Sequence, residues 1–137
     1  MYKGITLLSL GMLNNDNIHK NRENMNETIE KQQIKEFANR YGYSDVEPYE
    51  VVKVISNQTV EIRAMDTEQT VFPKQFHIGG FSAHCSDNRN QDYKYISNPD
   101  NPVYRIRWSK ANRNWYSAGG NKHLMEKLPS KFYDYNF

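Results

Sequence analysis

The segment "GGFSAHCSDNRNQDYKY", Gly79–Tyr95, gathers many of the side chains that could do chemistry in this chain. His84 stands next to Cys85, the single cysteine, and a run of amide and acidic side chains follows. These residue types raise four alternatives: a metal site, a nucleophile with its base, a nucleotide-binding loop, or a polar connection with no role of its own.

A metal site is not predicted here. His77, His84 and Cys85 are close in sequence, but a structural zinc site usually takes four ligands and often two cysteines two to four residues apart. In a strand, the adjacent His84 and Cys85 would point to opposite faces. We therefore expect no metal and no cofactor.

Catalysis is not predicted either. Cys85 reads most simply as a small, semi-buried side chain, and Asp87 and Asp92 as turn caps. The chain contains neither G-x-x-x-x-G-K-[ST] nor G-x-G-x-x-G, so no standard phosphate loop is present. We expect no catalytic residues and a protein that is not an enzyme.

Recognition without chemistry remains. Phe81 follows two glycines and offers an aromatic plane that could lie across a purine base. Asn88, Asn90 and Gln91 offer amide donors and acceptors, and Arg89 adds a cation. The segment is thus predicted to be a ligand-facing loop.

Two further cations follow in "YRIRW". Arg105 and Arg107 are two residues apart, so they project from the same face of a strand, and guanidinium groups suit phosphates. The alternative is a solvated strand face opposite Tyr104, Ile106 and Trp108. The predicted ligand-binding residues are Phe81, Asn88, Asn90, Gln91, Arg105 and Arg107.

The elements that must position these residues are mostly strands. A helix is predicted over residues 26–42, because Ile34, Phe37, Ala38 and Tyr41 form one apolar stripe that Gly42 ends. Alternation and turn residues predict strands over 49–55, 59–65, 70–78 (broken at Pro73), 92–96, 103–109, 114–118 and 131–137. The expected fold is mostly β (α+β): a small antiparallel barrel or curled sheet of six or seven short strands, preceded by one N-terminal helix.

Composition predicts one domain of 137 residues: a leader or contact segment over 1–25, the helix over 26–42 and a β-rich core over 48–137. Up to Cys85 the chain carries nine Lys/Arg and eleven Asp/Glu, and from Ser86 onward nine and five, which is too weak a basic excess for a duplex-DNA binder. The apolar leader lacks a cleavage site and is too short to span a bilayer, and Met25 is an alternative start. A cytoplasmic protein that associates through exposed apolar surface is expected.

Several of these stretches together resemble a known family. The predicted N-terminal helix, "YEVVKVISNQTVEIRAMDTE", the Gly-Gly-Phe loop, "QDYKYISNPDNPVYRIRW" and the end "KFYDYNF" are similar to small phage proteins, the first type of Thoeris anti-defence proteins. Some members end in a similar Tyr-Tyr-Asp-Phe-Ser-Phe and carry a comparable Ser-Gln-Asp-Tyr…Asn-Pro stretch. The resemblance covers roughly residues 47–137 and contains no single diagnostic motif.

The resemblance implies a sponge in the cytoplasm of an infected bacterial host. Such proteins sequester, without cleaving it, the cyclic ADP-ribose isomer that TIR-domain immune enzymes make. Members assemble dimers into hexamers, and some also hold cyclic oligonucleotides at a second kind of site. Their pockets use an aromatic residue, an Asn and Arg side chains, for which the candidates here are Phe81, Asn88 or Asn90, and Arg105 or Arg107.

Other functions remain open on the residues alone. The main alternative is a small β-barrel that binds single-stranded nucleic acid, which ten Tyr and a basic second half would suit. An enzyme that opens the nucleotide and a phage structural or adaptor protein without a ligand are two more. The sponge hypothesis predicts a cyclic nucleotide ligand, a homo-oligomer, no membrane association and no stable binding of long nucleic acid.

Overall fold

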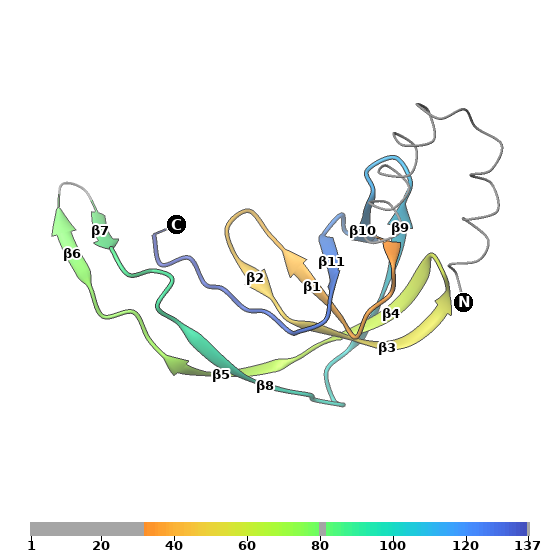
Figure 1. Ribbon diagram of the computed structural model, residues 1–137, viewed down its shortest axis with the longest axis horizontal. Helices are drawn as coiled ribbons and strands as arrows, with labels where there is room; N and C mark the ends of the chain where they lie inside the picture. The colour runs from red at the N-terminus through yellow and green to blue at the C-terminus, as the bar shows by residue number, and fades with distance from the viewer. Residues whose placement is uncertain (1–31, 80–81, 137) are drawn as a thin grey trace, which may run out of the picture. The chain divides into compact units, whose positions relative to one another are not determined.

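The computed structural model describes residues 32–79 and 82–136, all within one compact unit, Gln32–Phe137 (Figure 1). This part of the chain is mostly β. Its strands are β1 (Phe37–Tyr41), β2 (Val46–Glu47), β3 (Tyr49–Ser56), β4 (Thr59–Ala64), β5 (Asp66–Val71), β6 (Phe76–Gly79), β7 (Ser82–Cys85), β8 (Asp92–Ile96), β9 (Val103–Ser109), β10 (Asn114–Ser117) and β11 (Lys122–Glu126).

Six of these strands form an antiparallel β-barrel. Hydrogen bonds join them in the order β1, β3, β4, β9, β10 and β11, and β11 pairs with β1 to close the ring. Closure matters because it leaves no open sheet edge between β1 and β11. The short strand β2 adds to β1 at Arg40 and Tyr41.

Alternation along the strands builds the barrel core. In β4, Val60 and Ile62 are buried between more exposed neighbours, and in β9 the buried residues are Ile106 and Trp108. Trp108 meets the fully buried Trp115 of β10 edge to face, with ring centroids 5.9 Å apart. The core cluster consists of Ala38, Val60, Ile62, Ile106, Trp108, Trp115 and Met125.

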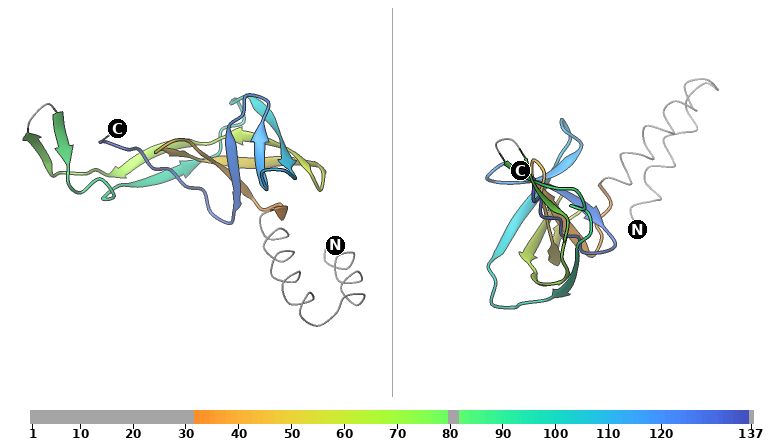
Figure 2. Two further views of the ribbon diagram at one scale, coloured as in Figure 1. Left: turned by 90° about the horizontal axis from the view of Figure 1, so that it is seen from above. Right: turned by 90° about the vertical axis from the view of Figure 1, so that its left-hand side faces the viewer.

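Two short ribbons continue from the barrel: β5 pairs with β8, and β6 pairs with β7. β4 ends at Ala64 and β5 begins at Asp66, so one run of chain serves both sheets. The C-terminal segment after β11 follows the β5–β8 ribbon towards the β6–β7 hairpin, as the views in Figures 1 and 2 show. A bond from Gln69 Nε2 to the Tyr135 hydroxyl, 2.9 Å long, fixes it there.

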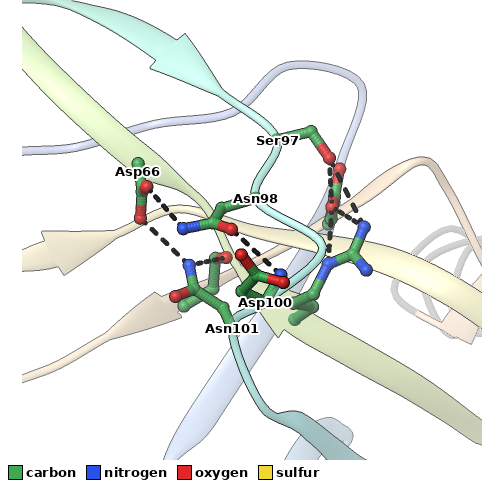
Figure 3. A network of polar contacts seen from close by, with 8 residues as sticks. Asp66, Ser97, Asn98, Asp100 and Asn101 are labelled. Atoms are coloured by element: carbon green, nitrogen blue, oxygen red, sulfur yellow. Dashed lines mark hydrogen bonds and ion pairs between the residues drawn. The ribbon is translucent and has the colours of Figure 1, made fainter.

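A polar network secures the crossing from β8 to β9 (Figure 3). The Asp66 carboxylate accepts hydrogen bonds from the side-chain amides of Asn101 (3.0 Å) and Asn98 (2.8 Å), which lower the pKa of Asp66. Beside it, Glu50 accepts bonds from Arg63 and Ser97. The Pro/Asn turn predicted over residues 97–102 lies in this crossing. It connects two strands that do not pair with each other, because β8 pairs with β5 and β9 with β4.

The predicted strands are largely confirmed, and the hairpin of 49–55 with 59–65 is β3 with β4. The predicted strand over 70–78 is two strands, since β5 ends at Val71 and β6 begins at Phe76, on either side of Pro73. The final strand over 131–137 is wrong in the described residues, where only Phe132 forms a bridge, to Val46. β11, which closes the barrel, was not predicted.

The helix predicted over 26–42 is wrong in its C-terminal part, and residues 26–31 lie outside the described residues. No helix occurs in the described chain from Gln33 onward, and Phe37–Tyr41 is strand β1. Its five residue pairs with β11 bury Ala38 and Asn39 completely. Tertiary pairing has therefore overridden the helical spacing of the apolar residues.

A buried amide reinforces the closure. Asn39 Nδ2 donates to Glu126 Oε1 and to the Leu128 carbonyl oxygen, both at 2.9 Å, and Asn39 Oδ1 accepts from the Ser130 amide at 3.1 Å. The Tyr41 hydroxyl donates to the same Glu126 oxygen at 2.7 Å. Asn39 thereby ties β1 both to β11 and to the chain that leaves it.

Removing this amide should destabilise the barrel. Asn39→Ala loses three hydrogen bonds at a fully buried position, so we expect the unfolding free energy to fall by about 2–4 kcal/mol. Denaturant titration of tryptophan fluorescence measures it. Asn112→Ala is the control, because this exposed side chain has no hydrogen bond within the described chain; a change equal to the control would contradict the role of Asn39.

His123, on β11, should make stability depend on pH. It is 2% exposed, its Nδ1 donates to the Ala38 carbonyl oxygen at 2.8 Å, and its ring meets Tyr49 edge to face. Burial, followed by the charge of Arg40, lowers the pKa of His123. In the unfolded chain His123 is protonated near pH 6.5, whereas in the folded chain it stays neutral to lower pH. The free energy of unfolding therefore falls as the pH drops below about 6.5.

The variant His123→Asn retains an N–H near the position of Nδ1 but cannot titrate. We expect its unfolding free energy to change less than that of the wild type between about pH 7.5 and 5.5, measured by urea titration. Carboxylates with lowered pKa values lose their contribution only at more acidic pH, around and below the ordinary value of 3.8. Equal slopes for both proteins would refute the assignment.

Candidate functional site

A cavity of about 600 Å³ lies where the β7–β8 loop meets the C-terminal segment. It is lined from β7 and its loop, from the turn between β1 and β2, and from the end of the chain. The lining residues are Ser44, His84, Cys85, Ser86, Asp87, Asn88, Arg89, Asn90, Phe132, Asp134 and Asn136.

Asp87 organises the loop. Its carboxylate accepts backbone N–H bonds from Lys74 and Gln75, both at 2.9 Å, and longer contacts from the Cys85 thiol and the Asn90 amide at 3.5 Å. These bonds, led by that from Lys74, lower the pKa of Asp87 to about 2. The ionised carboxylate thus joins the segment before β6 to the loop after β7.

A second carboxylate, that of Asp134, lines the cavity on the side of the C-terminal segment. Asp134 Oδ1 accepts from the backbone N–H of Asn136 and from Asn88 Nδ2, both at 2.9 Å, and these bonds lower the pKa of Asp134. The Asp134 amide in turn donates to Asp45 Oδ1 at 2.8 Å. Both acids are therefore ionised at neutral pH and already occupied by donors.

The cation of the cavity is Arg89. Its guanidinium lies over the Phe132 ring, 5.5 Å from the centroid, and it is exposed. Within the described chain Arg89 makes no ion pair. A guanidinium held on a ring with its N–H groups unused can donate to a phosphate or to the edge of a base.

The thiol of Cys85 is poorly placed as a nucleophile. Cys85 is 2% exposed, and burial, together with its bond to Asp87, raises the pKa of the thiol. The neighbouring His84 is exposed, so the two side chains face opposite sides of β7, as expected for a strand. Among the described residues, no three His, Cys, Asp or Glu side chains are grouped to hold a metal ion.

The predicted site residues are only partly brought together. Asn88 and Asn90 line the cavity, while Gln91 lies next to it in sequence and bonds the C-terminal segment instead. Arg105 and Arg107 are exposed on β9 and do not line the cavity, and Arg105 pairs with Glu61 at 3.2 Å. Phe81 lies outside the described residues.

Sequence reasoning missed the contribution of the chain end. Phe132, Asp134 and Asn136 line the cavity together with Ser44, although more than forty positions separate the chain end from the loop in sequence. Composition could have indicated this contribution, because "KFYDYNF" contains aromatic and amide side chains as the loop does. The segment was instead interpreted as a strand.

Comparison with known proteins finds no similar protein: no family model matches the chain, and neither does any curated protein or solved structure. No helix of the described residues is long and apolar enough to cross a membrane.

Asp87 gives a direct test of how the loop is built. Asp87→Asn keeps the shape but turns one acceptor into a donor that faces a backbone N–H, so the amides of Lys74 and Gln75 should exchange with solvent faster. The wild type should show the same loss of protection, relative to the intrinsic exchange rate at each pH, only as the pH falls towards 2 and the carboxylate is protonated. Hydrogen exchange measured by NMR provides the rates.

Asp100→Asn is the matched control, because the Asp100 side chain accepts no hydrogen bond within the described chain. Unchanged exchange at Lys74 and Gln75 in Asp87→Asn would mean that the carboxylate does not hold this loop.

Proposed function

We propose that this protein is a sponge. It binds a cyclic ADP-ribose isomer that serves as an immune signal, and it sequesters this small cyclic nucleotide without cleaving it. The observation that carries the proposal is the cavity of about 600 Å³ on the β7–β8 loop. Its size is within the range typical of small-molecule sites. The resemblance to phage anti-defence proteins supplies the ligand class.

The chemistry of the lining supports a nucleotide. Arg89 and the ring of Phe132 offer a cation and an aromatic surface, and Asn90 offers an amide at the same cavity. The ionised carboxylates of Asp87 and Asp134 already accept hydrogen bonds from the protein, and their charge disfavours a ligand phosphate on their side of the cavity. The phosphates are therefore assigned to Arg89, the guanidinium that lines the cavity over the Phe132 ring.

Sequestration makes a prediction about the fate of the ligand. When the full chain is mixed with cyclic ADP-ribose isomers and then denatured by heat, the bound isomer should return unchanged by chromatography. A new product would indicate an enzyme instead. Tight binding of oligonucleotides that strengthens with length and weakens steeply with salt would favour the single-stranded nucleic-acid barrel.

Variants test the predicted contacts. Phe81→Ala should weaken binding by about 5- to 150-fold through lost stacking, and Arg89→Ala by a similar factor or more through a lost charged hydrogen bond. The melting temperature of the free protein should hardly change in either. A sharp fall in the melting temperature of Phe81→Ala would identify a core residue and refute the stacking role.

A further inference from the structure

The C-terminal segment Phe132–Asn136, here called the strap, is held by side-chain amides rather than by a strand ladder. Gln91 Nε2 donates to the Tyr133 carbonyl at 2.8 Å, and the Tyr133 N–H donates to Gln91 Oε1 at 2.9 Å. Asn136 does the same with Cys85: its Nδ2 donates to the Cys85 carbonyl (2.9 Å) and its Oδ1 accepts from the Cys85 N–H (2.7 Å). Each amide replaces the pair of backbone bonds that a neighbouring strand residue would supply.

Asn88 is the third amide that holds the strap, through one carboxylate and one backbone N–H. Its Nδ2 donates to Asp134 Oδ1 at 2.9 Å, and its Oδ1 accepts from the Tyr135 N–H at 3.0 Å. Gln91 is further occupied, since its Oε1 also accepts from the Tyr93 hydroxyl. Amides that are engaged at both ends have little hydrogen-bonding capacity left for a ligand.

The strap also forms one wall of the cavity. Phe132, Asp134 and Asn136 belong to it, and the opposite wall comes from the β7–β8 loop. The contact of Arg89 with Phe132 crosses between the two walls. The cavity therefore exists only while the strap is docked on the loop.

Taking these contacts together, we propose that Asn88, Gln91 and Asn136 are positioning residues: they dock the strap on the β7–β8 loop, and the docked strap completes the ligand cavity. Only the last step, the coupling to ligand, rests on the proposed function. Asn88 and Gln91, predicted from the sequence to contact the ligand, are thereby assigned to holding the strap on the loop.

The strap can open without the barrel. It begins at the Phe132–Val46 bridge, after β11 has ended at Glu126, and most of its bonds lie at partly buried or exposed positions. Neutral hydrogen bonds in such positions contribute little each, so opening should occur as a local event. Tyr135 adds ring contacts to Phe76 and Tyr133.

The chain carries its own reporter of docking. Cys85 is the only cysteine, it is 2% exposed, and both of its backbone polar groups bond to Asn136. In the full chain, an aryl disulfide reagent should label Cys85 slowly. Gln91→Glu and Asn136→Asp each place a carboxylate against a backbone carbonyl, so labelling should accelerate about tenfold or more.

Asn112→Asp makes the same chemical change at an exposed turn and should leave the labelling rate unchanged. Tryptophan fluorescence, from Trp108 and Trp115 in the core, should stay native in all variants. Labelling at the wild-type rate in both strap variants would overturn the proposal. So would loss of the tryptophan signal along with faster labelling, because the strap would then belong to the cooperative unit of the barrel.

Ligand coupling is tested on the same proteins with cyclic ADP-ribose isomers. Binding should slow the labelling of wild-type Cys85, and Gln91→Glu should weaken binding about fivefold or more. If an isomer binds but neither effect occurs, the strap does not complete the site and the proposal is wrong. If no isomer binds the wild type, the proposed function fails, while the labelling comparison still decides whether the amides hold the strap.

Discussion

The pairing of β1 with β11 is the contact on which the rest of the structure depends. It closes the barrel, and it places two chain segments that the site needs. β1 leads directly into the turn that carries Ser44, and β11 leads into the chain that ends as the strap. Asn39 stabilises both directions at once, since its amide bonds Glu126 on β11 and the backbone at Leu128 and Ser130 beyond it. A barrel left open at this seam would present two free strand edges and would no longer direct the chain end towards the β7–β8 loop.

Different forces hold the barrel and the site. The barrel is stabilised by apolar burial, with Trp115 and its neighbours removed from water on strands that alternate inward and outward. The cavity is assembled by hydrogen bonds of carboxylates and amides. Asp87, for example, accepts bonds from two backbone N–H groups in the segment before β6. Such bonds fix geometry well but contribute little net free energy each, because water competes for the same groups. The site can therefore change its order while the barrel stays folded.

The sequence predicted the parts of the fold in which a local pattern and the final packing agree. Alternating Val60 and Ile62, or Ile106 and Trp108, identified strands because one face of each is buried. It misplaced β1, because the helical spacing of its apolar residues carries no information about a distant partner strand. It missed β11 for a related reason: a five-residue strand containing buried His123 has little apolar alternation to detect.

The same distinction applies to the site and bears on what it can do. The loop amides were recognisable as polar groups meant for specific partners, but their partners, at the far end of the chain, were not. The carboxylate of Asp87 is engaged as well, by the backbone N–H groups of Lys74 and Gln75. Asp87, with a pKa of about 2, is a weak base, and the raised pKa of Cys85 keeps the thiol protonated. His84, the imidazole of the cavity, has no hydrogen bond within the described chain to orient it as a base. The acids and amides of the cavity thus serve its own architecture, which leaves the Arg89 guanidinium and the Phe132 ring as the groups with capacity for the proposed ligand.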